Sequence, residues 1–182
     1  MAKLISKTYG EALFELALEE NKLDDYLEEA TMALKIIREN PEFSAMMQHP
    51  RIDRDEKVNI VENVFGPYLS REVTGLLRLI VQKDRYSEAK DILEWFIAQV
   101  KSEKGIGQAS VVSAVALTDA QQRKIKDRLL ETTSFKEMEM DFSVDPALIG
   151  GLKIRIGDRV VDSSISSKLD GLKSELMKVQ LA

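Results

Sequence analysis

A segment near the C-terminus, residues 150–165, constrains the fold of this chain more than any other part of it. Its sequence is GGLKIRIGDRVVDSSI. Apolar and basic side chains alternate along the first half, which is typical of a strand with one buried face, and Gly157-Asp158 supply a two-residue turn of type II′. Pairing outward from that turn sets Ile154 opposite Val161 and Lys153 opposite Asp162. One register therefore joins apolar to apolar and plus to minus, and the segment predicts a β-hairpin.

The surroundings of the hairpin and the start of the chain resemble a known family. Pro-Ala-Leu-Ile at 146–149 precedes the hairpin, and a long amphipathic stretch follows it. Residues 9–14, Tyr-Gly-Glu-Ala-Leu-Phe, are similar to the Tyr-Ala-x-Ala-Leu stretch that begins the first helix of the delta subunit of F-type ATP synthases. The mitochondrial counterpart of that subunit is the oligomycin-sensitivity-conferring protein. Gly10 departs from the usual Ala, which weakens the helix by up to ~1 kcal/mol. Length and element order match over essentially the whole chain.

Composition sets the broad class. At 182 residues, 44% hydrophobic and 31% charged, the chain is expected to fold as one large or two small soluble domains. It has no cysteine, which excludes disulfides and thiolate chemistry. We expect neither a signal peptide nor a membrane span, because no run approaches the ~20 apolar residues that a span needs. With 26 basic and 31 acidic residues the net charge is −5, so we do not expect the chain to bind nucleic acid.

Apolar residues repeat at helical spacing from Leu4 to about Lys104, and Pro or Gly divides this stretch into six helical segments. The predicted breaks are Asn40-Pro41, His49-Pro50, Gly66-Pro67 and Gly105. Asp53 and Glu56 stand at capping-box-like spacing before the fourth segment. These features predict a six-helix bundle over residues 1–105.

Beyond Gly107 the apolar period changes to two. Strands are predicted at Ala109–Ala116 and along 138–144, where apolar residues alternate with Glu137, Glu139, Asp141 and Ser143. Between them Thr118 and Gln121 are expected to cap a helix that turns Ile125 and Leu129 inward. The order strand, helix, strand, hairpin, helix predicts a small α+β domain at 106–182, and an α+β class for the whole chain.

Catalytic chemistry is missing from the sequence. The single histidine, His49, is expected in a loop before Pro50, and no G-x-S-x-G elbow exists. Gly150-Gly151 lies before a strand and not before a helix, so it does not fit a phosphate loop, and we expect it to let the chain turn into the hairpin. The alternating acidic residues at 137–141 are expected on a solvated face. We therefore predict no catalytic, cofactor-binding or metal-binding residues.

Two helices are expected to offer surface to partners. In the first, Ile5, Tyr9, Ala12, Leu13, Leu16 and Ala17 form one apolar stripe, and Leu4, Phe14 and Leu18 lie roughly opposite. Either the stripe docks a partner helix while Phe14 and Leu18 pack inward, or this helix is central and both faces are core. In the last, Ile165, Leu169, Leu172, Leu176 and Val179 form a narrow seam. It packs on its own sheet or, as the rival interpretation, docks a partner helix.

The resemblance implies a non-catalytic stator subunit between the catalytic head and the peripheral stalk. It implies that residues 1–105 bind the N-terminal segments of the alpha subunits and that 106–182 contact the b-type stalk subunits, at the cytoplasmic face of the bacterial membrane. Carried over by position, the candidate head contacts are Tyr9, Ala12, Leu13, Leu76, Leu77 and Ile80. An alternative is a soluble two-domain adaptor whose helical bundle binds amphipathic peptides outside any ATP synthase, and an enzyme is a third possibility.

Overall fold

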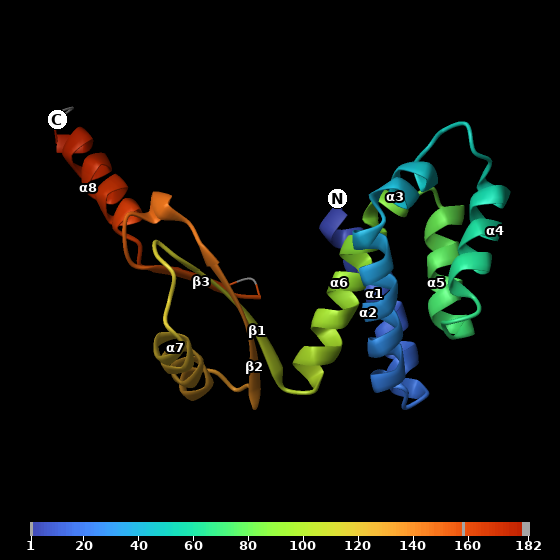
Figure 1. Cartoon of the computed structure of the whole chain (residues 1–182), viewed down its shortest axis with the longest axis horizontal. Helices are drawn as coiled ribbons and strands as arrows, with labels where there is room; N and C mark the ends of the chain where they lie inside the picture. Colours follow the sequence, from blue (N-terminus) through green and yellow to red (C-terminus); the bar gives the residue numbers. More distant parts are fainter. Residues whose placement is uncertain (1, 158, 180–182) are drawn as a thin grey trace. The chain divides into compact units, whose positions relative to one another are not determined.

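The computed structural model describes residues 2–157 and 159–179, and the chain divides into two compact units, Met1–Lys101 and Ser102–Ala182. The first unit is helical, and the second combines helices with a sheet (Figure 1). The α+β class predicted from the sequence is therefore confirmed. The division falls a few residues before the change of apolar period at 105–107.

The first unit is a set of helices around one hydrophobic core. The elements are α1 (Ala2–Glu19), α2 (Leu23–Glu39), α3 (Pro41–Met47), α4 (Arg54–Phe65), α5 (Arg71–Gln82), the 3-10 turn η1 (Tyr86–Glu88) and α6 (Ala89–Glu103). Each of the α-helices contributes buried apolar side chains to this core, and among the largest are those of Tyr26, Phe65 and Phe96. The core draws on residues from Leu13 to Val100.

Proline and glycine end the helices at the predicted breaks. α2 stops at Glu39, and Pro41 opens α3 at a position where its missing N–H leaves no bond unmade. α4 ends at Phe65, directly before Gly66-Pro67. Gly105 follows the end of α6 with a φ of +75°, a conformation that glycine adopts without strain.

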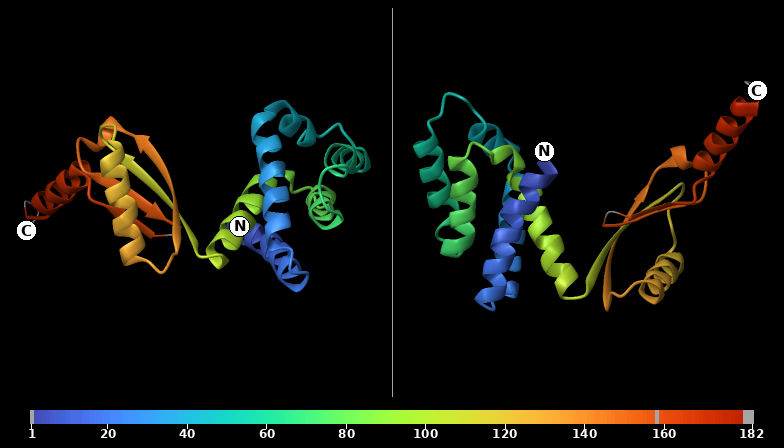
Figure 2. Two further views of the ribbon diagram at one scale, coloured as in Figure 1. Left: turned by 60° about the horizontal axis from the view of Figure 1, so that its bottom comes forward. Right: turned by 180° about the vertical axis from the view of Figure 1, so that it is seen from behind.

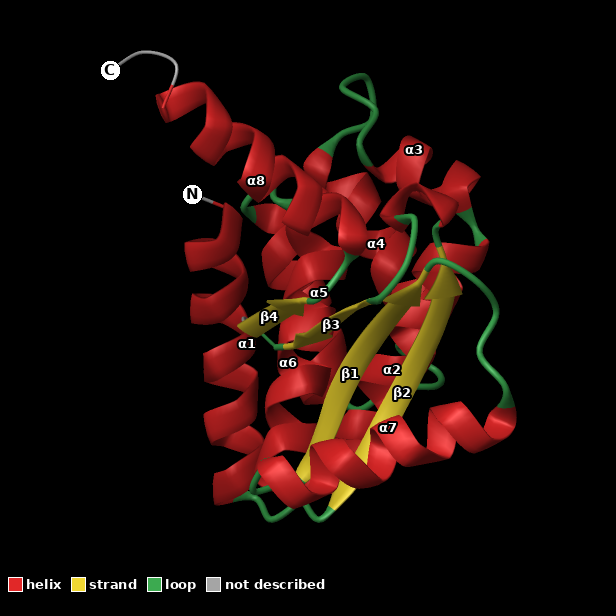
Figure 3. Ribbon diagram, turned by 90° about the vertical axis from the view of Figure 1, so that its left-hand side faces the viewer, coloured by secondary structure: helices red, strands yellow, loops and turns green. Residues whose placement is uncertain are grey.

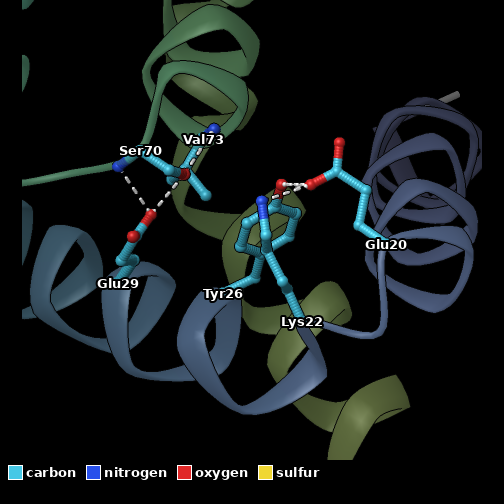
Figure 4. A network of polar contacts seen from close by, with 6 residues as sticks. All are labelled: Glu20, Lys22, Tyr26, Glu29, Ser70 and Val73. Carbon is cyan, nitrogen blue, oxygen red and sulfur yellow. Dashed lines mark hydrogen bonds and ion pairs between the residues drawn. The ribbon is translucent and has the colours of Figure 1, made fainter.

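Polar contacts fasten α2 to its neighbours (Figure 4). The N–H and hydroxyl of Ser70, the N-cap of α5, donate to Glu29 Oε2 at 2.8 and 2.6 Å. Tyr26 and Lys22 both donate to Glu20 Oε2 at 2.8 Å. Burial raises the pKa of the Tyr26 hydroxyl, and its bond to the Glu20 carboxylate adds to the rise. A carboxylate from α2 thus holds the start of α5.

The second unit is built on a sheet of strand order β2-β1-β3-β4 within the described residues. Its elements are β1 (Ile106–Ser113), α7 (Asp119–Thr132), β2 (Glu137–Val144), the 3-10 turn η2 (Pro146–Leu148), β3 (Leu152–Ile156), β4 (Arg159–Asp162) and α8 (Ile165–Val179). β1 and β2 are parallel and are connected through α7, whereas β1 with β3 and β3 with β4 are antiparallel. This mixed sheet positions one end of the hairpin beside η2 and α8.

The predicted hairpin register is confirmed. Ile154 pairs with Val161 and Lys153 with Asp162, and Lys153 Nζ lies 3.8 Å from Asp162 Oδ2. Gly157 has the positive φ, +55°, expected of the first turn residue. The second turn residue, Asp158, lies outside the described residues, and the predicted turn type falls partly on it. Gly151, with φ +82°, lets the chain enter the hairpin, because a Cβ there would collide with the Ser163 carbonyl.

The predicted start and end of the first strand were wrong by three residues. The strand covers Ile106–Ser113 and not 109–116, because its pairing partner β2 begins at Glu137, opposite Ile106. At the other end, the Ser113 hydroxyl donates to the Val115 carbonyl at 2.6 Å, and the Val115 side chain is exposed. Pairing between strands that are distant in sequence, and not local apolar spacing, sets these limits.

Of the two helix caps predicted from the sequence, one forms and one does not. Thr118 and Gln121 make the full predicted capping box at the start of α7, with the Thr118 N–H donating to Gln121 Oε1 at 2.9 Å. Asp53 is the N-cap residue of α4 as predicted, yet its side chain makes no capping hydrogen bond. The spacing of Asp53 and Glu56 therefore locates the helix start without supplying a capping box.

The sheet has one apolar and one polar face. Alternate residues of all strands share the apolar face: Ala109 and Val111, Met138, Met140 and Phe142, Leu152 and Ile154, and Val161. α7 lies on this face and crosses β1 and β2, with β3 and β4 beside it (Figure 3). Glu137, Glu139 and Asp141 are exposed on the opposite face, which confirms the predicted solvated face.

Candidate functional site

Helix α1 fits neither of the two interpretations completely, because it buries part of the apolar stripe that was expected to dock a partner and exposes the rest. Leu13 and Ala17 are buried, together with Gly10 and Ser6, which lie one and two turns before Leu13. Ala12, on the predicted docking stripe, is exposed as that prediction requires. Leu18 was predicted to pack inward, but it is 42% exposed. The predicted stripe is therefore split, because part of it faces the core of the free chain.

Phe14 and Tyr9 occupy the border between these two faces. Phe14 is half-buried against the core, in the direction predicted for it. Tyr9 is also half-buried, and the Arg85 guanidinium carbon lies 5.9 Å from its ring centroid. That arrangement is a cation–π contact. Of the predicted α1 contacts, Tyr9 and Ala12 thus have accessible surface.

The three α5 candidates are core residues of the free chain. Leu76, Leu77 and Ile80 are all buried in the same cluster as Leu13, and α1 packs on α5. The structure therefore brings the predicted residues of the two helices together. However, the free chain leaves these four side chains almost no surface for a partner. Their proposed role in binding remains a prediction.

Helix α8 presents its apolar seam to solvent. Leu169 is 51% exposed and Leu172 56%, and Ile165 is exposed as well. The views of Figure 2 show α8 leaving the end of the sheet. The prediction that the seam packs on its own sheet was therefore wrong for Leu169 and Leu172, and Ile165 packs only partly, beside Gly150. The side chains of Leu176 and Val179 lie outside the described residues.

The start of α8 is fixed by a small polar network. The hydroxyl and N–H of Ser164, a buried residue, donate to Asp162 Oδ1 at 2.7 and 2.9 Å, and the Ser167 hydroxyl donates to Asp162 Oδ2 at 2.9 Å. The bonds from Ser164, followed by the bond from Ser167, lower the pKa of Asp162 from 3.8 to about 2. Sequence reasoning assigned Asp162 only a pairing role in the hairpin, although its Asp-x-Ser spacing could have indicated this turn.

Three features of the described residues bear on catalysis, metal binding and membrane insertion. His49 lies exposed in a loop, as predicted, and its Nδ1 accepts from the Arg51 N–H at 3.2 Å. In the described part of the chain, no group of three His, Cys, Asp or Glu side chains could hold a metal ion. Among the helices that can be described, none is both long and apolar enough to cross a membrane.

One helical unit and one α+β unit both carry exposed apolar side chains on helices, which is typical of proteins that act through binding surfaces. The model of the family "ATP synthase delta (OSCP) subunit" matches residues 5–176. The chain is 49% identical over 181 residues to an ATP synthase subunit delta of Lachnoclostridium phytofermentans, covering 100% of both chains. It is 35% identical over 179 residues to the one of Alkaliphilus oremlandii, covering 98% of this chain and 99% of that one. The chain belongs to the ATP synthase delta (OSCP) subunit family.

A solved structure supports the same fold. A chain of the Toxoplasma gondii mitochondrial ATP synthase hexamer superposes with a TM-score of 0.81 and 20% identity, covering 94% of this chain and 97% of that one. The family is that of a structural and not a catalytic subunit, so the predicted non-catalytic stator component of the F-type ATP synthase is confirmed. The alternatives, an adaptor outside any ATP synthase and an enzyme, are set aside.

Proposed function

We propose that this chain joins the catalytic head of the ATP synthase to its peripheral stalk and resists the torque of the rotor. Residues 1–105 act as a six-helix bundle that binds the N-terminal segments of the alpha subunits. Residues 106–182 contact the b-type stalk subunits. The complex holds the chain at the cytoplasmic face of the bacterial cell membrane, and the chain itself touches the membrane only through its partners.

The observation that carries this proposal is the family match across both units, from residue 5 to residue 176. A connector needs two binding surfaces, and each unit has one candidate. On the first unit the surface is the outer side of α1 with Tyr9 and Ala12, packed over the core residues Leu13, Leu76, Leu77 and Ile80. A partner helix that settles there would approach the backbone closely at Ala12, because alanine has the smallest side chain of that face.

The second surface is the α8 seam of Ile165, Leu169 and Leu172. Apolar side chains in line along a helix and half exposed are typical of a helix that pairs with another one. A connection under torque requires slow dissociation of the two proteins. Burial of apolar area in the interface and a fixed direction of the helix both slow dissociation. The polar network of Asp162, Ser164 and Ser167 supplies that direction.

Binding by the purified chain tests the proposal. We expect the chain to show no ATP hydrolysis and to bind a catalytic head that lacks it, an alpha-subunit N-terminal peptide, and the C-terminal segment of a b-type stalk subunit. Leu169→Glu places a carboxylate in the seam and should weaken binding of the stalk segment. Gly171→Glu adds the same carboxylate on another side of α8, where a new side chain meets open space, and is the matched control. Intrinsic ATPase activity after rigorous purification, or no binding to any of the three, would overturn the proposal.

A further inference from the structure

An apolar groove lies beside α7, on the apolar face of the sheet. Its volume is about 450 Å³, and its walls are Ile125 and Leu129 of α7 and Leu152 and Ile154 of β3. These four side chains are only half-buried. The groove exists because a single helix crosses the strands on this face and covers β1 and β2 but not β3 and β4 (Figure 3).

The apolar floor continues to the edge of the sheet. Ile154 pairs with Val161 of the edge strand β4, so both side chains point to the same face, and Val161 is 60% exposed. The fully buried apolar residues in the described part of this unit are Ala109, Val111 and Met138. A sheet face normally buries its apolar side against a complete layer of helices. One more helix over β3 and β4 would complete that layer.

Charge distinguishes this side of α7 from the other. The titratable residues that line the groove are Lys124 and Arg128, which are both basic and exposed. The opposite side of α7 faces a hollow that mixes signs, with Arg123 and Lys126 close to Asp119, Glu137 and Glu139. Arg128 also pairs with Glu131 at 2.9 Å, but an exposed pair of this kind is weak and exchanges readily.

We propose that the groove between α7 and β3 binds one amphipathic helix of a partner, whose apolar stripe is flanked by acidic residues on the side that meets Lys124 and Arg128. The inference rests on the proposed function, since the partner helix would belong to the peripheral stalk. It adds a docking site separate from the α8 seam and names the charge of the helix that fits it. The apolar stripe fills the space over Leu152 and Ile154, and the acidic flank selects one orientation.

Synthetic peptides and the full-length chain test this inference. The probe is a helical peptide with leucines at i, i+3, i+4 and i+7 and glutamates along one flank, beside a twin with lysines in place of the glutamates. We expect the acidic peptide to bind and the basic twin to bind at least about ten-fold more weakly. The double variant Lys124→Glu, Arg128→Glu should weaken the acidic peptide about ten-fold and strengthen the basic twin.

A matched double variant serves as the control. Arg123→Glu with Lys126→Glu makes the same change of net charge on the other side of α7 and should leave binding of the acidic peptide almost unchanged. If both double variants lose the same affinity for the acidic peptide, the attraction is only long-range electrostatics, and the inference that the peptide binds in the groove is overturned. A third peptide with a central proline, which cannot remain helical, should not bind; equal binding would indicate docking of an extended strand and would also overturn the inference.

The α8 seam is the competing site in the same unit. If Leu169→Glu weakens the acidic peptide as much as the Lys124 and Arg128 variant does, the peptide docks on α8, and the groove inference fails while the proposed function stands. Binding of the stalk segment further distinguishes the groove inference from the proposed function. Loss of its binding in the Lys124 and Arg128 variant supports the groove, whether or not Leu169→Glu also weakens it. A wild-type chain that binds neither the stalk segment, nor the alpha-subunit peptide, nor the catalytic head contradicts the proposed function.

Discussion

Gly10 of α1 provides space for a neighbouring side chain and not flexibility. Its backbone is helical, and a Cβ built on it would collide with the ring of Trp95 from α6. The ring therefore lies directly against the backbone of α1. Helix propensity alone predicts that alanine would be more stable than glycine here by up to ~1 kcal/mol. The contact with Trp95 reverses that expectation.

Gly10→Ala should lower the melting temperature, because overpacking costs about 1–3 kcal/mol and exceeds the gain in propensity. Gly75→Ala in α5 is the control, since a Cβ there meets nothing within 4 Å, and it should raise the melting temperature. Circular dichroism of both variants checks the comparison. In a chain that also carries Trp95→Leu, Gly10→Ala should become stabilising. Equal stabilisation at both glycines in the unmodified chain would mean that Trp95 moves aside at no cost.

Ala12 separates docking surface from core on the same helix. Because Ala12 is exposed, Ala12→Asp should change the melting temperature only slightly, by the ~0.5 kcal/mol of lost helix propensity. In a bound partner helix the carboxylate would be desolvated without a partner charge, and affinity for an alpha-subunit N-terminal peptide should fall ~30-fold or more. Thermal melts beside binding titrations measure the two effects.

Ala98→Asp provides the comparison for that test, because Ala98 is an exposed alanine on α6. It should leave affinity unchanged. If Ala12→Asp moves neither the melting temperature nor the affinity, α1 is not the docking surface. A steep loss of stability would instead mean that position 12 is buried in solution.

The hairpin and the start of α8 share Asp162, so we expect the stability of this junction to depend on pH. Its pKa is lowered from 3.8 to about 2 by the Ser164 and Ser167 bonds, with Lys153 adding a smaller effect. A lowered pKa in the folded state means that the contribution to stability is present above pH 4 and is lost as the pH falls toward 2. Asp162→Asn removes the titrating group.

We therefore expect wild type to be more stable than Asp162→Asn at pH 7, with the difference shrinking between pH 4 and pH 2. Denaturant unfolding of both proteins across this range checks it. Taking the difference between the two proteins cancels the titration of the other carboxylates. A difference that does not change with pH would show that the Ser164 and Ser167 bonds do not depend on the charge of Asp162.

Local patterns determined which elements could be predicted from the sequence. The hairpin register, the Thr118 cap and the helix ends at Pro41 and Gly66 depend on residues close together in the chain, and all of them were predicted correctly. The limits of β1 depend on β2, about thirty residues away, and were wrong. Local sequence therefore determines where helices end but not where distant strands meet.

Faces of helices were predicted less well, for a physical reason. Helix α1 carries apolar residues on two sides, and its buried side is chosen by α5 and by the Trp95 ring at Gly10, which the sequence does not bring together. The α8 seam shows the opposite failure, since an apolar seam indicates burial somewhere but not against which chain. In both cases the periodicity was correct and the partner was unknown.

The two units differ in how much of their apolar surface they bury. The core of the first unit lies entirely between Leu13 and Val100, whereas in the described part of the second unit only Ala109, Val111 and Met138 are fully buried apolar residues. A small domain with so little buried area is marginally stable alone. We therefore expect the second unit to gain more stability from binding a partner than the first.

A fragment of residues 1–105 should therefore fold alone as a helical domain that keeps the head contact. It retains the whole core of the first unit and the Gly105 that follows α6, and it loses the bonds in which the Gly105 carbonyl accepts from the N–H groups of Lys136 and Glu137 at 2.8 and 3.2 Å. Trp95 is the sole tryptophan of the chain, so its fluorescence reports this unit alone. We expect a cooperative melt by circular dichroism and by Trp95 emission, with a midpoint close to that of the Trp95 transition in the whole chain.

A fragment of residues 1–96, which lacks the buried Ile97 and Val100, is the control and should be largely unfolded. If the 1–105 fragment is itself unfolded, the two units depend on a shared core, and the division of labour between head and stalk cannot be assigned to separate domains.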